Sequence, residues 1–128
     1  MAAEKKVIIC DTAPAAIGPY SSGINAGTFI FTAGQLGVDP KSGNLVQGGI
    51  KAQTRQALTN LGAILETAGS NLTKVVKVTV FLSDISEFQQ MNEVYADFFP
   101  VDPPARSAFQ VAALPRGAAV EIEAIALS

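Results

Sequence analysis

The chain has 128 residues, no histidine, and a formal net charge of -2 from nine basic and eleven acidic side chains. A chain of this length with 48% hydrophobic residues can form one domain with a sizeable core. The Lys and Arg residues are scattered and form no basic stripe that could bind nucleic acid. Because the chain has no histidine, it lacks both the usual general base and the commonest metal ligand. Catalysis would need carboxylate, Tyr, Lys, Arg or backbone groups.

The chain is predicted to be cytoplasmic and to have no membrane partner. Its single cysteine, Cys10, can form no internal disulfide, which fits a reducing compartment. No stretch approaches the ~18 apolar residues of a membrane span, and the polar start, Met1–Lys6, lacks the apolar run of a signal peptide. Only 16% of residues are charged, against ~25% in average chains, so we expect apolar surface to be buried between subunits.

The first third of the chain is predicted to form strands. A short strand is expected at residues 6–10, and a loop follows over 11–18, where proline and glycine oppose regular structure. Two more extended segments flank the turn Asn25-Ala26-Gly27. The second of them, residues 28–33, is rich in aromatic and β-branched side chains, which favour strands.

The middle of the chain is predicted to form two helices around one strand. After Gly48-Gly49, apolar residues recur at helical spacing until Gly69, a predicted C-cap. Residues 74–82 are almost continuously apolar, which predicts a central strand buried on both faces. The second helix is expected to begin with Ser86 as its N-cap and to carry one apolar stripe formed by Phe88, Met91, Tyr95 and Phe98.

The last third returns to strands at residues 105–112 and 118–127, separated by a break at 114–117. The order βββαβαββ predicts an α+β fold, with a single domain over residues 1–128 and a mixed sheet carrying two helices on one face. The other face would still present Ile125 and Leu127 beside Glu121 and Glu123. This face needs a cover, which self-association supplies most simply, and glutamates in such surroundings are candidates for raised pKa values.

Arg106 and Glu121 are the strongest candidates for chemistry. Arg106 follows a proline-rich loop at the start of a strand, where its planar fork of donors could hold a carboxylate. Taken alone, an arginine is more often a surface or ion-pairing residue. Glu121, if partly desolvated, could act as general acid or base, and a structural ion pair or interface hydrogen bond is its alternative role.

Four further positions have both structural and functional interpretations. Tyr20 is either an aromatic plug or a pocket wall that offers its hydroxyl. Gly34 marks a bulge or leaves a backbone N–H open to a ligand, and its segment, 32–37, lacks the pattern of a phosphate loop. On the second helix, Phe88 is expected in the core, whereas Asn92 is either solvated or aimed at a cleft.

Together these residues resemble the reactive intermediate deaminase A family, also called RidA, YjgF or the liver perchloric-acid-soluble proteins. The resemblance runs nearly end to end. It is carried by residues 17–21, 33–35 with 39–40, 53–54 with 60–61, 75–82, and 92 with 95 and 98–99. Its most specific part is Pro104-Ala105-Arg106-Ser107 followed by Glu121-Ile122-Glu123.

The resemblance implies a chorismate-mutase-like fold and a homotrimer whose sheets form a central barrel, with sites at the subunit interfaces. It implies a 2-iminobutanoate/2-iminopropanoate deaminase, which hydrolyses imines and enamines such as 2-iminobutyrate and 2-aminoacrylate to 2-keto acids and ammonia. No metal or organic cofactor is implied. Arg106 would bind the substrate carboxylate, and Glu121 would orient or activate water and move the proton. The remaining wall would comprise Tyr20, which closes the pocket, Gly34, which gives a backbone contact, and Phe88 and Asn92 at the mouth.

Two positions depart from the family pattern. Ala33 stands where many members have Ser, and Ala108, also in the substrate-binding wall, stands where many have Cys. Their loss of polarity would narrow or shift the substrate range. Two other function classes stay open: a trimeric ligand-binding or chaperone-like protein without catalysis, and an RNA-directed translation inhibitor or endoribonuclease. The acidic balance and the lack of histidine count against the RNA-directed role.

Overall fold

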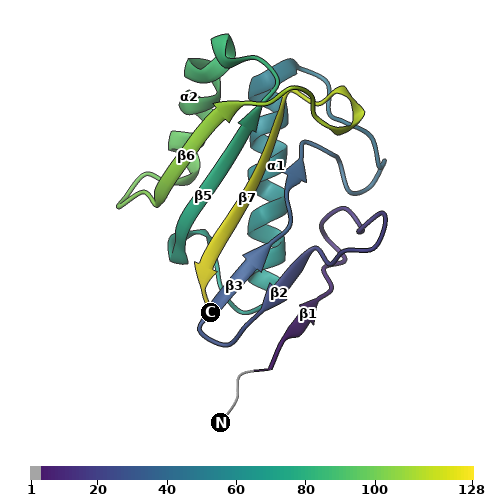
Figure 1. Cartoon of the computed structure of the whole chain (residues 1–128), viewed down its shortest axis with the longest axis vertical. Coiled ribbons are helices and arrows are strands. Elements are labelled where there is room, and N and C mark those ends of the chain that lie inside the picture. Colours follow the sequence, from purple (N-terminus) through teal and green to yellow (C-terminus); the bar gives the residue numbers. More distant parts are fainter. Residues whose placement is uncertain (1–3) are drawn as a thin grey trace.

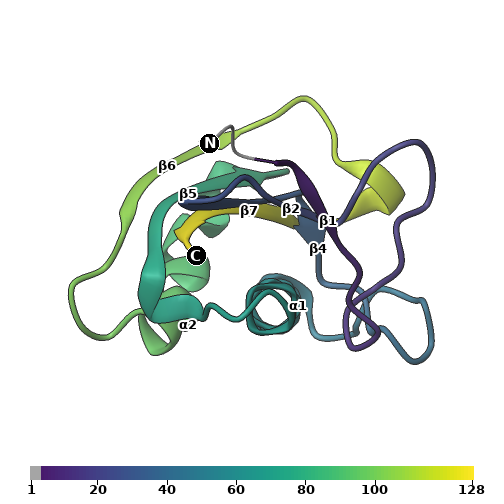
Figure 2. The ribbon, with the colours of Figure 1, turned by 90° about the horizontal axis from the view of Figure 1, so that it is seen from below.

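The chain folds into a mixed sheet with two helices on one face (Figures 1 and 2). The structure is a computed structural model that describes residues 4–128. The first three residues of the polar start Met1–Lys6 lie outside the described part. The main elements are β1 (Lys6–Ile8), β2 (Gly23–Asn25), β3 (Phe29–Thr32), β4 (Gln35–Leu36), α1 (Gly49–Thr67), β5 (Val75–Leu82), α2 (Phe88–Phe98), β6 (Ala105–Gln110) and β7 (Val120–Leu127).

The strands follow the order β1-β2-β3-β7-β5-β6, and the short β4 also pairs with β7. Only β5 and β6 are parallel, joined through α2, and the other pairs are antiparallel. The predicted α+β class, mixed sheet and helix placement are therefore confirmed. The sequence did not predict β4, whose two residues are too few to show a strand period.

The first helix is confirmed, and it ends just before Gly69, although the C-cap itself is Ala68, one residue earlier than predicted. Gly69 adopts φ 84°, and its N–H bonds to the Glu66 carbonyl, while the Ser70 N–H bonds to the Leu65 carbonyl. This paired arrangement is the Schellman motif, in which glycine takes the left-handed position at no steric cost. One side of α1 packs against the sheet through fully buried residues that include Ala57, Leu58, Leu61, Ile64 and Leu65.

The prediction that β5 is buried on both faces is wrong for the single chain. Its side chains Val78, Val80 and Leu82 are fully buried against the helices. On the opposite face Phe81 is only half-buried, and Val76, beside the bulge that interrupts pairing with β7, is exposed. The physical reason is that both helices cover the same side of the sheet, as Figure 2 shows.

The expected N-cap of the second helix is also wrong. Ser86 lies inside a 3-10 turn, Ile85–Glu87, that precedes α2. Asp84 caps this turn, because its carboxylate accepts hydrogen bonds from the Ser86 N–H at 2.9 Å and the Ser86 hydroxyl at 2.7 Å. Both serine and aspartate favour N-cap positions, so the sequence pattern could not separate them.

The sheet face away from the helices, here called the outer face, is rich in apolar side chains. The register places Phe31 beside Ile125 and Phe29 beside Leu127, and it aligns Phe81 with Phe109. Exposed members of this face include Phe29, Phe31, Phe109 and Leu127. Within residues 4–128, no helix is both long and apolar enough to cross a membrane.

Candidate active site

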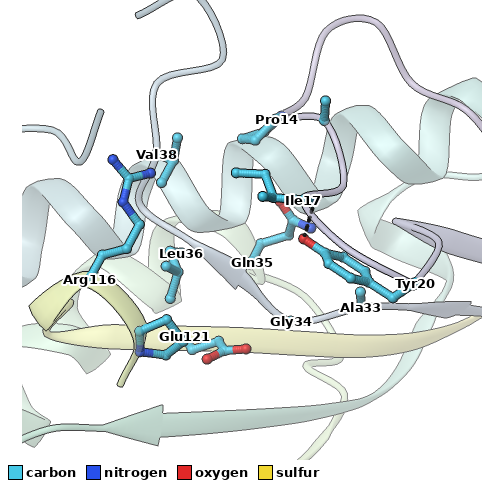
Figure 3. Close-up of a pocket in the computed structure, with 12 residues that line it drawn as sticks. Pro14, Ile17, Tyr20, Ala33, Gly34, Gln35, Leu36, Val38, Arg116 and Glu121 are labelled. Carbon is cyan, nitrogen blue, oxygen red and sulfur yellow. Dashed lines mark hydrogen bonds between the residues drawn. The ribbon is translucent and has the colours of Figure 1, made fainter. Parts of the chain in front are cut away.

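Glu121 lies in a pocket on the outer face (Figure 3). As the second residue of β7 it pairs with Leu36 of β4 on one side and Phe81 of β5 on the other. The pocket has a volume of about 550 Å³. Its walls come from the loop before β2, the β3 to β4 segment and the 3-10 turn Pro115–Gly117, with lining residues that include Pro14, Ile17, Tyr20, Gly34, Val38 and Arg116.

Burial and close packing define the surroundings of the Glu121 carboxylate. Burial, and secondarily the charge of Glu123, raises the pKa of Glu121. The carboxyl group packs directly against Gly34, where an added Cβ would lie only 2.8 Å from the Glu121 carboxyl carbon. A half-buried carboxyl group with a raised pKa can exchange a proton nearer neutral pH than an ordinary glutamate.

Tyr20 forms part of the pocket wall, and half of its surface is exposed. Its hydroxyl accepts a hydrogen bond of 3.2 Å from the Ile17 N–H, so it ties together the turn at Gly18, where φ is 127°. Tyr20 and Gly34 thus meet Glu121 in one pocket. Ala33, the position that departs from the resembled pattern, lines the same space.

Two amides from α1 support the pocket wall. The fully buried Asn60 donates hydrogen bonds to the carbonyls of Leu36 at 3.2 Å and Val38 at 2.9 Å. The Gln53 side chain accepts a hydrogen bond of 2.8 Å from the Ala119 N–H, just before β7. These contacts fix the two segments that flank Glu121. Both amides belong to the resembled pattern, at residues 53–54 and 60–61, but the sequence does not reveal this role.

Arg106 belongs to a second group, on the helix face of β6. Its guanidinium donates a hydrogen bond of 2.7 Å to the Asn92 side-chain oxygen on α2. It also lies 4.6 Å from the ring centre of Tyr95 and 5.3 Å from that of Phe88. Phe88 and Asn92, which were expected at the mouth of the pocket, contact Arg106 instead, and Tyr95 joins them. Ala108 lies two residues along the same strand face.

The sequence pattern places Tyr95 on an apolar stripe and in the resembled family pattern, without a contact to Arg106. Its side chain is buried, and its hydroxyl has no hydrogen-bond partner among residues 4–128. Burial raises the pKa of Tyr95, although the positive charge of Arg106 opposes this shift. The ring therefore serves the guanidinium as an aromatic surface, a role that only the spacing of the folded α2 and β6 reveals.

One chain keeps the two groups apart. Arg106 is in register with Val78 on the helix face of β5, whereas Glu121 is in register with Phe81 on the outer face. Strand β5 separates their strands, so the guanidinium and the carboxylate point to opposite sides of the sheet. The pocket of Glu121 has a different arginine, Arg116, which lies in the predicted break between strands at residues 114–117. In the described part of the chain, no three His, Cys, Asp or Glu residues gather as a metal site.

Comparisons with known proteins give strong matches over nearly the whole chain. The family model described as endoribonuclease L-PSP matches residues 10–128. A RutC family protein of Pyrococcus horikoshii is 55% identical, with 95% of this chain and 97% of the relative covered. The 2-iminobutanoate/2-iminopropanoate deaminase of Bos taurus is 54% identical, with 96% and 90% covered. The crystal structure of E. coli TdcF with bound serine is 41% identical and superposes with a TM-score of 0.92, covering 96% of this chain and 98% of that one.

Proposed function

The chain belongs to the endoribonuclease L-PSP family, which includes the YjgF and RidA proteins, and on that premise we propose that it hydrolyses small 2-imino acids to 2-keto acids and ammonia. The observation that carries the proposal is the half-buried Glu121 carboxylate at a pocket, with its raised pKa. Relatives that are 50–54% identical and named 2-iminobutanoate/2-iminopropanoate deaminase support the substrate class.

The proposed reaction adds one water molecule across the C=N bond. Glu121 accepts a proton as the water oxygen attacks the imine carbon, and it returns that proton to nitrogen, which gives a carbinolamine. The hydroxyl proton of the carbinolamine then passes to nitrogen through Glu121, so the C–N bond breaks, the C=O bond forms and ammonia leaves. A 2-keto acid remains. Imines hydrolyse in water unaided, so orientation and positioned proton transfer suffice, and the latter contributes about 10² to 10⁴-fold. The reaction needs no redox step, and we propose that no cofactor takes part.

We further propose that Arg106 grips the substrate carboxylate from a second copy of the chain. A guanidinium held by Asn92 and stacked on Tyr95 is well ordered for a two-point contact with a carboxylate. Because one chain turns Arg106 away from its own Glu121, the two meet only between copies. A chorismate-mutase-like homotrimer with a central barrel would supply this contact and would cover the apolar outer face.

The other site residues divide between the Glu121 pocket and the Arg106 group. Tyr20 closes the pocket, and Gly34 brings its backbone next to the substrate. Phe88 and Asn92 shape the Arg106 side, with Ala108 in the adjacent wall. A cytoplasmic location, as the lone Cys10 suggests, and a single domain over residues 1–128 complete the proposal.

Coupling the protein to a threonine dehydratase tests the activity, with semicarbazide trapping of the imine as the readout. We expect the wild-type protein to speed imine loss. With Arg106→Ala or Glu121→Gln, the imine should be lost only at the background rate. Arg55→Gln is the matched control, because Arg55 forms an exposed ion pair with Asp97 between the helices. Wild-type and Arg106→Ala rates that are equal at background would refute the hydrolase and favour a binding protein.

Mixing the two inactive variants tests the shared site. If Arg106 and Glu121 come from different copies, unfolding and refolding Arg106→Ala together with Glu121→Gln will create some intact sites. Random assembly in a closed ring predicts about one quarter of wild-type activity. Activity that stays at background, in a mixture shown by mass spectrometry to contain mixed assemblies, would place both residues' function within one chain. Light scattering that shows a monomer at micromolar concentration would exclude the interface site.

A further inference from the structure

Arg116 is the one basic residue among those that line the Glu121 pocket, and Glu121 is the one acidic residue. The ion pairs between residues 4–128 are Lys51 with Glu93 and Arg55 with Asp97, both between the helices. Arg116 therefore brings a guanidinium to the pocket that no carboxylate of residues 4–128 neutralises. Such a group is available to a negatively charged ligand.

The backbone holds Arg116 at the rim in an unusual conformation. Its φ of 61° and ψ of 17° lie in the left-handed region, which residues with a side chain rarely adopt. Pro115 precedes it, Gly117 follows with φ 68°, and the Ala118 N–H closes the turn on the Pro115 carbonyl at 3.1 Å. A costly backbone conformation at a pocket is a reason to look for function in the side chain it directs.

The two charges of the pocket lie in different parts of it. Figure 3 shows the Arg116 guanidinium beside Val38, whereas the Glu121 carboxylate turns the other way, toward Gly34. The walls between and opposite them are mainly apolar, with Leu36 between them and Pro14 and Ile17 across the space. A substrate with its imine carbon at Glu121 could therefore extend its side chain along an apolar wall to a cationic end.

We propose that Arg116 binds a second carboxylate, at the end of the substrate side chain, so that the pocket accepts dicarboxylic 2-imino acids derived from acidic amino acids. This inference rests on the proposed function, in which Arg106 holds the carboxylate next to the imine. The guanidinium fork matches a distal carboxylate in charge and in two-point geometry. The reaction is unchanged: water is added, ammonia leaves, and a dicarboxylic 2-keto acid is formed.

Two imines of equal chain length test the proposal. Amino-acid oxidases acting on L-glutamate and L-norvaline generate 2-iminopentanedioate and 2-iminopentanoate, which differ in the terminal carboxylate. We expect Arg116→Gln to lower kcat/KM for the dicarboxylic imine about 10 to 100-fold, as loss of a hydrogen bond to a charged group predicts. The ratio of kcat/KM for the dicarboxylic imine to kcat/KM for 2-iminopentanoate should therefore fall by about the same factor. Arg116→Lys should keep part of the preference, because it keeps the charge without the fork.

A control and a binding measurement separate the possible failures. Arg55→Gln removes the same charge from the helix layer and should leave the ratio of the two rates unchanged. Calorimetry should show that Arg116→Gln weakens binding of 2-oxopentanedioate but not of 2-oxopentanoate. Equal losses for both imines, or no loss for either, would overturn the role of Arg116. A wild-type protein inactive on both imines and on 2-iminobutanoate would instead refute the proposed function.

Discussion

The carboxyl group of Glu121 occupies the space that a side chain at Gly34 would need. A Cβ at position 34 would lie 2.8 Å from the carboxyl carbon and 3.0 Å from the Cγ of Glu121. The glycine therefore sets where the carboxylate sits, although its own backbone has no positive φ. The requirement is one of space rather than of backbone conformation.

We expect Gly34→Ala to displace Glu121 and to lower kcat for 2-iminobutanoate about 10² to 10⁴-fold, the usual contribution of a positioned acid or base. Gly62→Ala is the matched control. Gly62 lies inside α1, and a Cβ there would meet the Leu72 side chain at 3.5 Å, an ordinary contact distance. That change should leave kcat intact and raise the free energy of unfolding by about 1 kcal/mol. Full activity in folded Gly34→Ala would show that the position of Glu121 is not critical.

The pH dependence should follow the raised pKa of Glu121. If the carboxylate accepts the proton of water, kcat/KM falls as the pH drops through a value above that of an ordinary glutamate. Glu123→Gln removes the smaller cause of the shift, so this acid limb should move to lower pH. It should remain above the ordinary range, because burial is the larger cause. A limb unmoved by Glu123→Gln, measured over a full pH-rate profile, would assign it to another group.

The same shift has a consequence for stability, which can be measured without substrate. The folded state binds the Glu121 proton more tightly than the unfolded state, so stability is lost as the pH rises through the raised pKa. Glu121→Gln removes this loss. The variant should therefore have a higher free energy of unfolding than the wild type at neutral pH. The difference should shrink as the pH falls toward the glutamate value of the unfolded chain, which urea titrations at several pH values will show.

Tyr95 offers a test of how Arg106 is held. Tyr95→Phe keeps the ring and removes a buried hydroxyl that has no partner among the described residues, so activity and stability should be almost unchanged. Tyr95→Leu removes the aromatic face under the guanidinium. Its KM should rise about 2 to 30-fold, corresponding to the ~0.5 to 2 kcal/mol of a cation–π contact, with a smaller effect on kcat. An equal KM for the Leu and Phe variants would contradict this role.

Asn60 should be costly to replace because it serves two backbone carbonyls of the pocket wall. Asn60→Ala leaves the carbonyls of Leu36 and Val38 without this partner, and we expect the free energy of unfolding to fall by about 2 to 4 kcal/mol. Asn71→Ala is the matched control, since Asn71 only caps a 3-10 turn and should cost about 1 kcal/mol. Urea denaturation measures both values, and equal losses would remove the special status of Asn60.

The elements were predictable where one period or one cap dominates. The helical spacing before Gly69 and the alternation in residues 120–127 both led to the observed elements. The start of α2 was not predictable, because a 3-10 turn capped by Asp84 precedes the helix, and α2 itself begins after Glu87 without a side-chain cap. Burial of β5 depends on what covers each face of the sheet, and a run of apolar residues in the sequence does not reveal this.

The site was predictable as a set of residues but not as an arrangement. Tyr20, Gly34 and Glu121 meet in one pocket, and Arg106 meets Phe88 and Asn92. Strand β5 separates the two groups, and this separation depends on the strand order, which no local pattern reveals. Arg116 was not predictable as a site residue, because a basic residue in a break between strands is usually an exposed surface residue. Its left-handed backbone and its place on the pocket rim exist only in the folded chain.

In the proposed assembly, the apolar outer face would make the stability of this protein depend on its concentration. A chain that leaves Phe29, Phe31 and Leu127 in contact with water gains stability from any copy that covers them, by mass action. The melting temperature of the proposed trimer should therefore rise with protein concentration. A newly synthesised chain would be at its most vulnerable to aggregation and proteolysis in the interval before it finds its partners.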